Sequence, residues 1–155
     1  MLKTKSPISF EQDANLVKTL LEELLLEQSA LVRGDIELVE SIIDRKFTLL
    51  QQLSSVAKNR YEVLANNGFE ANESGMVAWI KLQADASVQK AWDRFQVELA
   101  RTKETNRLNG VLINKHFNRN QQLLNHLQGK QDSASVYGKN GQAKTALFNR
   151  SVLLA

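Results

Sequence analysis

Residues 91–127 read AWDRFQVELARTKETNRLNGVLINKHFNRNQQLLNHL, and this stretch decides the fold. From Val88 onward, alternating steps of three and four residues select one continuous face of a helix. This seam is apolar at both ends and rich in amides in its middle. We therefore expect one long helix that lies along other helices and carries no obvious chemistry. The seam consists of Val88, Trp92, Phe95, Leu99, Thr102, Asn106, Asn109, Ile113, His116, Asn120, Leu123 and Leu127.

Two further heptad patterns precede this stretch and are separated by a short break at Gly34. The first begins near Ser9, where Ser9 and Gln12 have the spacing of a capping box. A connection this short forces the two helices to run antiparallel. A short amphipathic piece, MVAWIKL, should plug the end of the bundle. The sequence predicts an all-α fold, an elongated antiparallel helical hairpin or bundle of long coiled-coil-like helices, at about 9–33, 35–66, 75–82 and 85–128.

The composition changes after this bundle. We expect a helical bundle domain over residues 1–128 and a flexible basic tail over residues 129–155 that holds a short amphipathic segment. The tail has four basic residues and one aspartate, so it carries the whole net charge of +3. Four basic residues spread over such a tail, with almost no aromatic residues, make no nucleic-acid site. Nucleic acid is therefore not an expected partner.

The composition and the motifs also exclude several function classes. The chain has no cysteine, which excludes disulfides and thiolate metal sites. No window reaches the roughly 18 apolar residues of a membrane span, and no secretory signal is readable, so we expect a cytoplasmic protein without membrane insertion. His116 and His126 would lie about 15 Å apart along a helix and cannot share a metal. With no catalytic motif either, we expect no enzyme, no metal and no cofactor.

The amides in the middle of the long seam allow two interpretations. Asn106, Asn109 and Asn120 lie on the seam itself. In one interpretation they are buried and fix the register of the bundle, as a seam asparagine does in coiled coils. In the other, this part of the seam is uncovered and meets a partner helix. Gly110 fits both interpretations, because a missing side chain lets another backbone approach closely.

Several short pieces, in a particular order, resemble a known family. They are the leucine-rich hairpin LVKTLLEELLLEQSALVRGDIELVESIIDRKFTLLQQL, then RYEVLANNG, the tryptophan of MVAWIKL and that of KAWDRF. The stretch NRLNGVLINKHFNRNQQLLNHLQG and the tail YGKNGQ follow. Together they resemble the FlgN family of flagellar type III export chaperones, from about Leu16 to the end of the chain.

The resemblance implies a role and partners. Members of this family are small helical cytoplasmic proteins that bind the hook-associated proteins of the hook–filament junction and keep them from assembling early. They deliver these clients to the cytoplasmic domain of the flagellar export gate. The rival function is that of a structural coiled-coil adaptor, which would use the same heptads to dimerise permanently. A homodimer is thus an open alternative.

We predict that the amide-rich end of the long helix and the tail together form the client surface. The seam is too polar to be all core, and exposed apolar residues on a tail are typical of partner binding. The residues that we expect to bind the client are Asn106, Asn109, Gly110, Ile113, Phe117, Leu124, Leu147 and Phe148. The likeness of the tail to the family's YG pair implies that Tyr137 contacts the export gate, with Gly138 turning the chain beside it.

Overall fold

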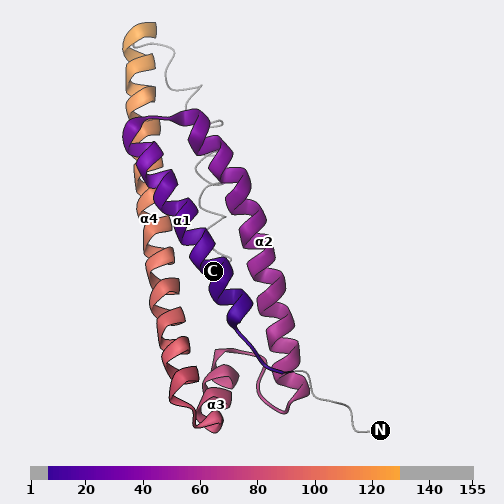
Figure 1. Cartoon of the computed structure of the whole chain (residues 1–155). Coiled ribbons are helices and arrows are strands. Elements are labelled where there is room, and N and C mark those ends of the chain that lie inside the picture. Colours follow the sequence, from indigo (N-terminus) through magenta and orange to yellow (C-terminus); the bar gives the residue numbers. More distant parts are fainter. Residues whose placement is uncertain (1–6, 130–155) are drawn as a thin grey trace.

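A computed structural model describes residues 7–129 of the chain (Figure 1). Within them it contains four helices, α1 (Glu11–Arg33), α2 (Ile36–Asn66), α3 (Glu73–Gln83) and α4 (Ala86–Gln128). Helices α1 and α2 form an antiparallel hairpin, and α4 runs along the other side of α1. Helix α1 therefore lies between α2 and α4 and packs on both. The prediction of an elongated all-α bundle is confirmed.

The sharp turn between α1 and α2 depends on two adjacent residues. Gly34 has φ 72°, a left-handed conformation that glycine adopts without strain, and its N–H donates to carbonyls of the last turn of α1. The carboxylate of Asp35 then accepts a hydrogen bond of 3.2 Å from the N–H of Leu38 and caps α2. These two residues end one helix and start the next, at the break that the sequence predicted at Gly34.

Two helix starts lie within two residues of the predicted positions. Helix α1 begins at Glu11, close to the predicted start near Ser9, and the Ser9 hydroxyl accepts a hydrogen bond of 3.2 Å from the N–H of Glu11, as a capping residue does. Helix α3 begins at Glu73 rather than 75, because Asn72 accepts a hydrogen bond of 2.9 Å from the N–H of Gly75 and caps it. Gly75 is itself required, since a Cβ there would collide with the backbone of the preceding loop.

The lower end of the bundle is its main apolar core. Trp92 and Phe95 of α4 pack on Phe10, with ring centroids 5.2 and 6.0 Å from the Phe10 ring. Met76 and Ile80 of α3 are buried in the same cluster, so α3 closes this end of the bundle as MVAWIKL was predicted to do. Such aromatic clusters contribute more than their area alone. The full cluster of buried residues is Phe10, Val17, Leu64, Met76, Ile80, Trp92 and Phe95.

Two buried ion pairs set the register of the hairpin. Asp13 pairs with Arg60, with 3.2 Å between Oδ1 and Nε, and Glu27 pairs with Lys46, with 3.1 Å between Oε1 and Nζ. The acidic residues are two heptads apart on α1, and the basic residues are two heptads apart on α2. Leu20 lies between them in an apolar layer. A slip of one heptad would bury charges against leucine, which is strongly unfavourable.

Candidate functional site

A buried polar layer joins the three long helices at mid-height. Glu27 and Asn109 are completely buried, and Lys46 is nearly so. The Asn109 amide donates to the carbonyl of Leu24 at 2.8 Å and to Oε1 of Glu27 at 2.9 Å. The Lys46 ammonium donates to both Glu27 oxygens and, at 3.3 Å, to Oδ1 of Asn106. The layer connects α1, α2 and α4 by hydrogen bonds that only one relative placement of the helices allows.

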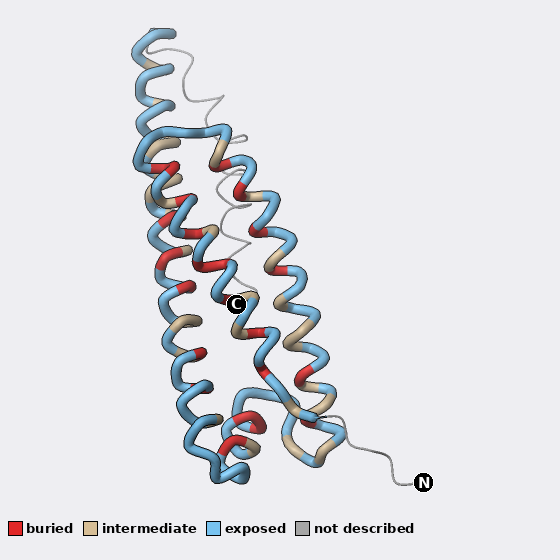
Figure 2. Tube along the Cα trace, in the orientation of Figure 1, coloured by how far each residue is buried: buried red, intermediate tan, exposed pale blue. Residues whose placement is uncertain are grey.

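Above this layer, α4 extends beyond the hairpin (Figure 1). The tip of the hairpin packs its buried residues Ala30, Leu31 and Val39 against Leu112 and Ile113 of α4. Among the described residues, none after Asn109 in α4 is buried. We call residues 114–128 of α4 the projecting end, and Figure 2 shows most of its surface exposed.

The projecting end carries large apolar side chains in solvent. Leu123, Leu124 and Leu127 have exposed fractions of 56%, 46% and 83%. Phe117 is half-buried and lies one turn after Ile113 on the same side of the helix. Because α4 extends beyond the tip of the hairpin (Figure 1), its apolar side continues past the helices that it packs on. A continuing apolar stripe of this kind is typical of a surface that meets a partner.

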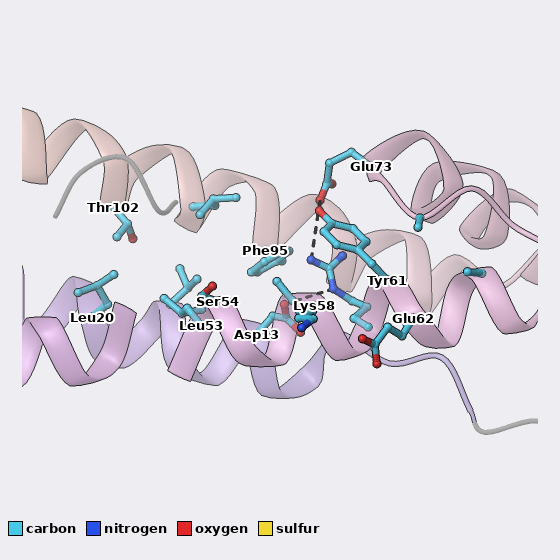
Figure 3. Close-up of a pocket in the computed structure, with 16 residues that line it drawn as sticks. Asp13, Leu20, Leu53, Ser54, Lys58, Tyr61, Glu62, Glu73, Phe95 and Thr102 are labelled. Carbon is cyan, nitrogen blue, oxygen red and sulfur yellow. Dashed lines mark hydrogen bonds and ion pairs between the residues drawn. The ribbon is translucent and has the colours of Figure 1, made fainter. Parts of the chain in front are cut away.

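A groove opens near the other end of the bundle, between α2 and α4. It has a volume of about 570 Å³, and α1 contributes its floor. We call it the α2–α4 groove. In Figure 3, Phe95 and Thr102 of α4 lie across from Leu53 and Ser54 of α2 and from Leu20 of α1, which lies beside Leu53.

The chain is matched by the family model described as FlgN protein, over residues 8–145. The chain belongs to the FlgN family. No significant match was found among curated proteins or among solved structures. FlgN proteins are flagellar export chaperones, so the resemblance seen in the sequence is confirmed at the level of the family.

The client-binding residues predicted for this FlgN protein fall into three groups in the structure. Asn109 and Asn106 take part in the buried polar layer, and Asn109 has no exposed surface. Gly110, Ile113 and Phe117 are half-buried and Leu124 is exposed, all on the upper part of α4. Leu147 and Phe148, and the gate-binding pair Tyr137 and Gly138, lie outside the described residues. The buried interpretation of the seam amides therefore describes Asn109, whereas Asn106 is half-buried and Asn120 is exposed.

Sequence reasoning did not find the α2–α4 groove of this FlgN protein. The signal was present in the heptad stripe of α2, where Ala57 stands in place of a large apolar residue and Arg60 follows it. A basic residue in a buried stripe needs an acidic partner, and the sequence offered too many acidic residues to choose among them. The structure selects Asp13 of α1.

Two ionisable side chains that line the groove, Asp13 and Tyr61, have raised pKa values. Burial raises the pKa of the Asp13 carboxyl above its ordinary value of 3.8, although the neighbouring Arg60 acts in the opposite direction. The Tyr61 hydroxyl donates a hydrogen bond of 2.6 Å to Glu73. Burial, together with this bond to Glu73, raises the pKa of Tyr61. The Arg60 guanidinium also lies 4.9 Å from the centre of the Tyr61 ring, at cation–π distance.

Two other kinds of site are absent from residues 7–129. There, no three His, Asp or Glu side chains are placed to hold a metal ion. None of the helices in that range has the length and apolarity that crossing a membrane requires. The described part of this FlgN protein has two distinctive surface features, the projecting end and the α2–α4 groove.

Proposed function

We propose that this chain is a cytoplasmic export chaperone for the hook–filament junction proteins of the flagellum. It binds their amphipathic terminal helices, prevents premature assembly, and delivers them to the flagellar export gate. Membership of the FlgN family supports the chaperone role. The main structural support for client binding is the set of exposed leucines at the projecting end.

Clients of this kind have apolar stripes that match the apolar side of the projecting end. Amphipathic terminal segments that are not yet assembled expose apolar stripes, which pair with one another unless they are covered. A partner helix that lies along the apolar side of α4 would bury Leu124 together with Ile113 and Phe117, a helix-to-helix mode of recognition. Leu147 and Phe148 complete the proposed client surface from the C-terminal segment. Because a single helix provides most of this surface, the affinity stays moderate and the client can be released for export.

The paired substitution Leu123→Asp and Leu124→Asp should weaken client binding at least about a hundredfold, since burying each leucine is worth about 1.5–3 kcal/mol and 1.4 kcal/mol is tenfold. The measurement is isothermal titration calorimetry with the isolated terminal segments of a junction protein. The melting temperature should stay nearly the same, because both side chains are already exposed in the free protein.

Val97→Asp provides the matched control. Val97 is also on α4 and 69% exposed, but it lies below the projecting end. The Val97→Asp variant should bind the client with the same affinity as the unmodified chain. Equal affinity of the double variant and the control would refute the projecting end as the client surface, while leaving the membership of the family untouched.

Tyr137 and Gly138 are the proposed contacts with the export gate. A tyrosine ring with its hydroxyl suits an interface that is apolar in part and hydrogen-bonded in part. Tyr137→Ala should lower the affinity for the cytoplasmic domain of the gate by about 1–3 kcal/mol, as loss of a buried interface aromatic does, with client binding unchanged. Surface plasmon resonance with gate and client on separate channels measures both. An equal loss on the two channels would contradict a contact specific to the gate.

A further inference from the structure

Helix α4 carries a long row of basic and aliphatic side chains on one side. Successive residues of an α-helix lie about 100° apart around its axis, and the members of this row fall within about 60° of one another. From Lys90 to Arg119 the row is about 44 Å long at the rise of an α-helix. We call it the basic side of α4. Its members are Lys90, Arg94, Val97, Arg101, Leu108, Leu112, Lys115 and Arg119.

The basic side of α4 is open to solvent and faces away from α2. All of its members except Leu112 are exposed. Val97 and Leu108, which are aliphatic, have exposed fractions of 69% and 40%. Asn106, which accepts a hydrogen bond from Lys46 of α2, lies about 150° further around the axis of α4. The basic side is therefore separate from the α2–α4 groove.

The positive charges on this side are not balanced by neighbouring acidic residues. Its five cations form no ion pair with another residue in the described part of the chain, and none of its members is acidic. On the flanks, Glu104 pairs with Arg107 at 2.8 Å, and Asp93 accepts a hydrogen bond of 2.9 Å from Gln89. Glu98 is half-buried in a separate cavity at the lower end of the bundle. The row thus combines five unpaired positive charges with exposed aliphatic side chains.

The shape and composition of the basic side suit a lipid surface better than a folded protein. It is the convex outer surface of a single helix, and a coiled-coil partner would require a mostly apolar seam. Long Lys and Arg side chains gain energy near an anionic membrane, and they adapt to head groups that move. Aliphatic side chains on the same side of a basic helix enter the boundary between head groups and acyl chains. Val97 and Leu108 have the exposure that this contact needs.

We propose that the basic side of α4 is a docking surface for a membrane that contains anionic phospholipids. The axis of α4 lies parallel to the membrane, the cations contact lipid phosphates, and Val97 and Leu108 enter between the head groups. This surface goes beyond client binding and does not depend on it. Ile113, Phe117 and Leu124 lie about 150° around α4 from the basic side, so the proposed client surface stays accessible on a docked chain.

Sedimentation of the full chain with lipid vesicles tests this proposal. One set of vesicles contains phosphatidylcholine alone, and the other contains phosphatidylcholine and phosphatidylglycerol in a ratio of three to one. At low salt, the chain should bind the second set at least about tenfold more tightly, because each cation near an anionic surface is attracted to it. Salt at about 1 M, where the Debye length is about 3 Å, should remove most of this difference. Equal binding to both sets at low salt, or no binding, would overturn the proposal.

Two matched pairs of substitutions locate the contact on α4. Arg101→Gln with Lys115→Gln changes the basic side, and Lys103→Gln with Arg107→Gln removes the same charges from other sides of the helix. The first pair should lower the affinity for phosphatidylglycerol vesicles at least about tenfold, and the second less than about threefold. All four residues are exposed, so the melting temperature should stay nearly the same. Equal effects of the two pairs would mean that only the overall charge attracts the chain, which overturns the proposal.

An acidic protein is the alternative occupant of the basic side. A synthetic helical peptide of Glu, Leu and Ala, with its acidic residues along one face, imitates such a partner. When this peptide is added to the sedimentation assay in equal charge to the anionic lipid, the chain should stay on the vesicles. Displacement of the chain by the peptide would mean that the basic side recognises an acidic helix rather than lipid, and this would overturn the proposal. Client binding is measured without lipid, so either result leaves the proposed chaperone function untouched.

Discussion

Lys46→Met should lower the free energy of unfolding by about 3–5 kcal/mol, the cost of removing one partner of a buried ion pair. The reason is the polar layer, in which Lys46 donates to both oxygens of the fully buried Glu27. Methionine has similar length and preserves the packing, so the loss comes from the carboxylate that remains buried without a counter-charge. Urea unfolding followed by circular dichroism measures the change.

A second substitution and a matched control separate charge from packing. Adding Glu27→Gln to Lys46→Met removes the unpaired charge and keeps an oxygen that accepts from Asn109, so it should recover at least half of the loss. Arg45→Met is the control, because Arg45 is the next residue in α2 but pairs with Glu23 at the surface, 44% exposed. Arg45→Met should lower the free energy of unfolding by less than about 1 kcal/mol. If Lys46→Met costs no more than the control, the polar layer does not hold the helices together.

Arg60→Met should also lower the free energy of unfolding by about 3–5 kcal/mol near neutral pH, for the same reason. It leaves Asp13 buried at the floor of the groove without its counter-charge. It also removes the guanidinium from beside Tyr61 and Trp92. Lys58→Met is the matched control on the same helix, since Lys58 is exposed at the rim of the groove, and it should change stability very little.

The pH dependence of the Arg60→Met variant has a definite sign. Burial already raises the pKa of Asp13 above 3.8, and removing Arg60 takes away the main opposing influence, so the pKa rises further. Between 3.8 and this folded-state pKa, the folded chain holds a proton that the unfolded chain has lost. The contribution of Asp13 to the stability of the variant is therefore fully present below 3.8 and is lost as the pH rises through the folded-state pKa of Asp13.

Comparison with a variant that lacks this carboxyl isolates its titration. Arg60→Met combined with Asp13→Asn contains the same other acidic groups, so the difference between the two stability curves reports Asp13 alone. The double variant should be more stable to unfolding than Arg60→Met alone, by a difference that is small at low pH and grows as the pH rises. A difference that stays constant with pH would mean that Asp13 is not buried in the folded state.

The sequence was a good guide to the helices and a poor guide to the site. The heptad steps and the pair Gly34 and Asp35 predicted two long helices and their turn within a few residues, because periodicity and capping are local properties. The start of α3 at Glu73, two residues before the predicted position, depended on which polar side chain accepts an N–H of the first turn, and this side chain is Asn72. Several side chains near this start could do so, and packing decides among them.

By itself, the sequence determined the four helices of residues 7–129 and the antiparallel hairpin, since each follows from residues that are close along the chain. It also determined the FlgN family, through the order of short motifs along the chain. Only the tertiary structure decided which polar side chains meet. Glu27, Lys46 and Asn109 come from three helices, and their pairing depends on the register and rotation of each helix. The same holds for Asp13 and Arg60. A seam residue faces either a neighbouring helix or solvent according to where that neighbour ends, and this is why Asn109 is core whereas Leu124, on the same helix, is exposed.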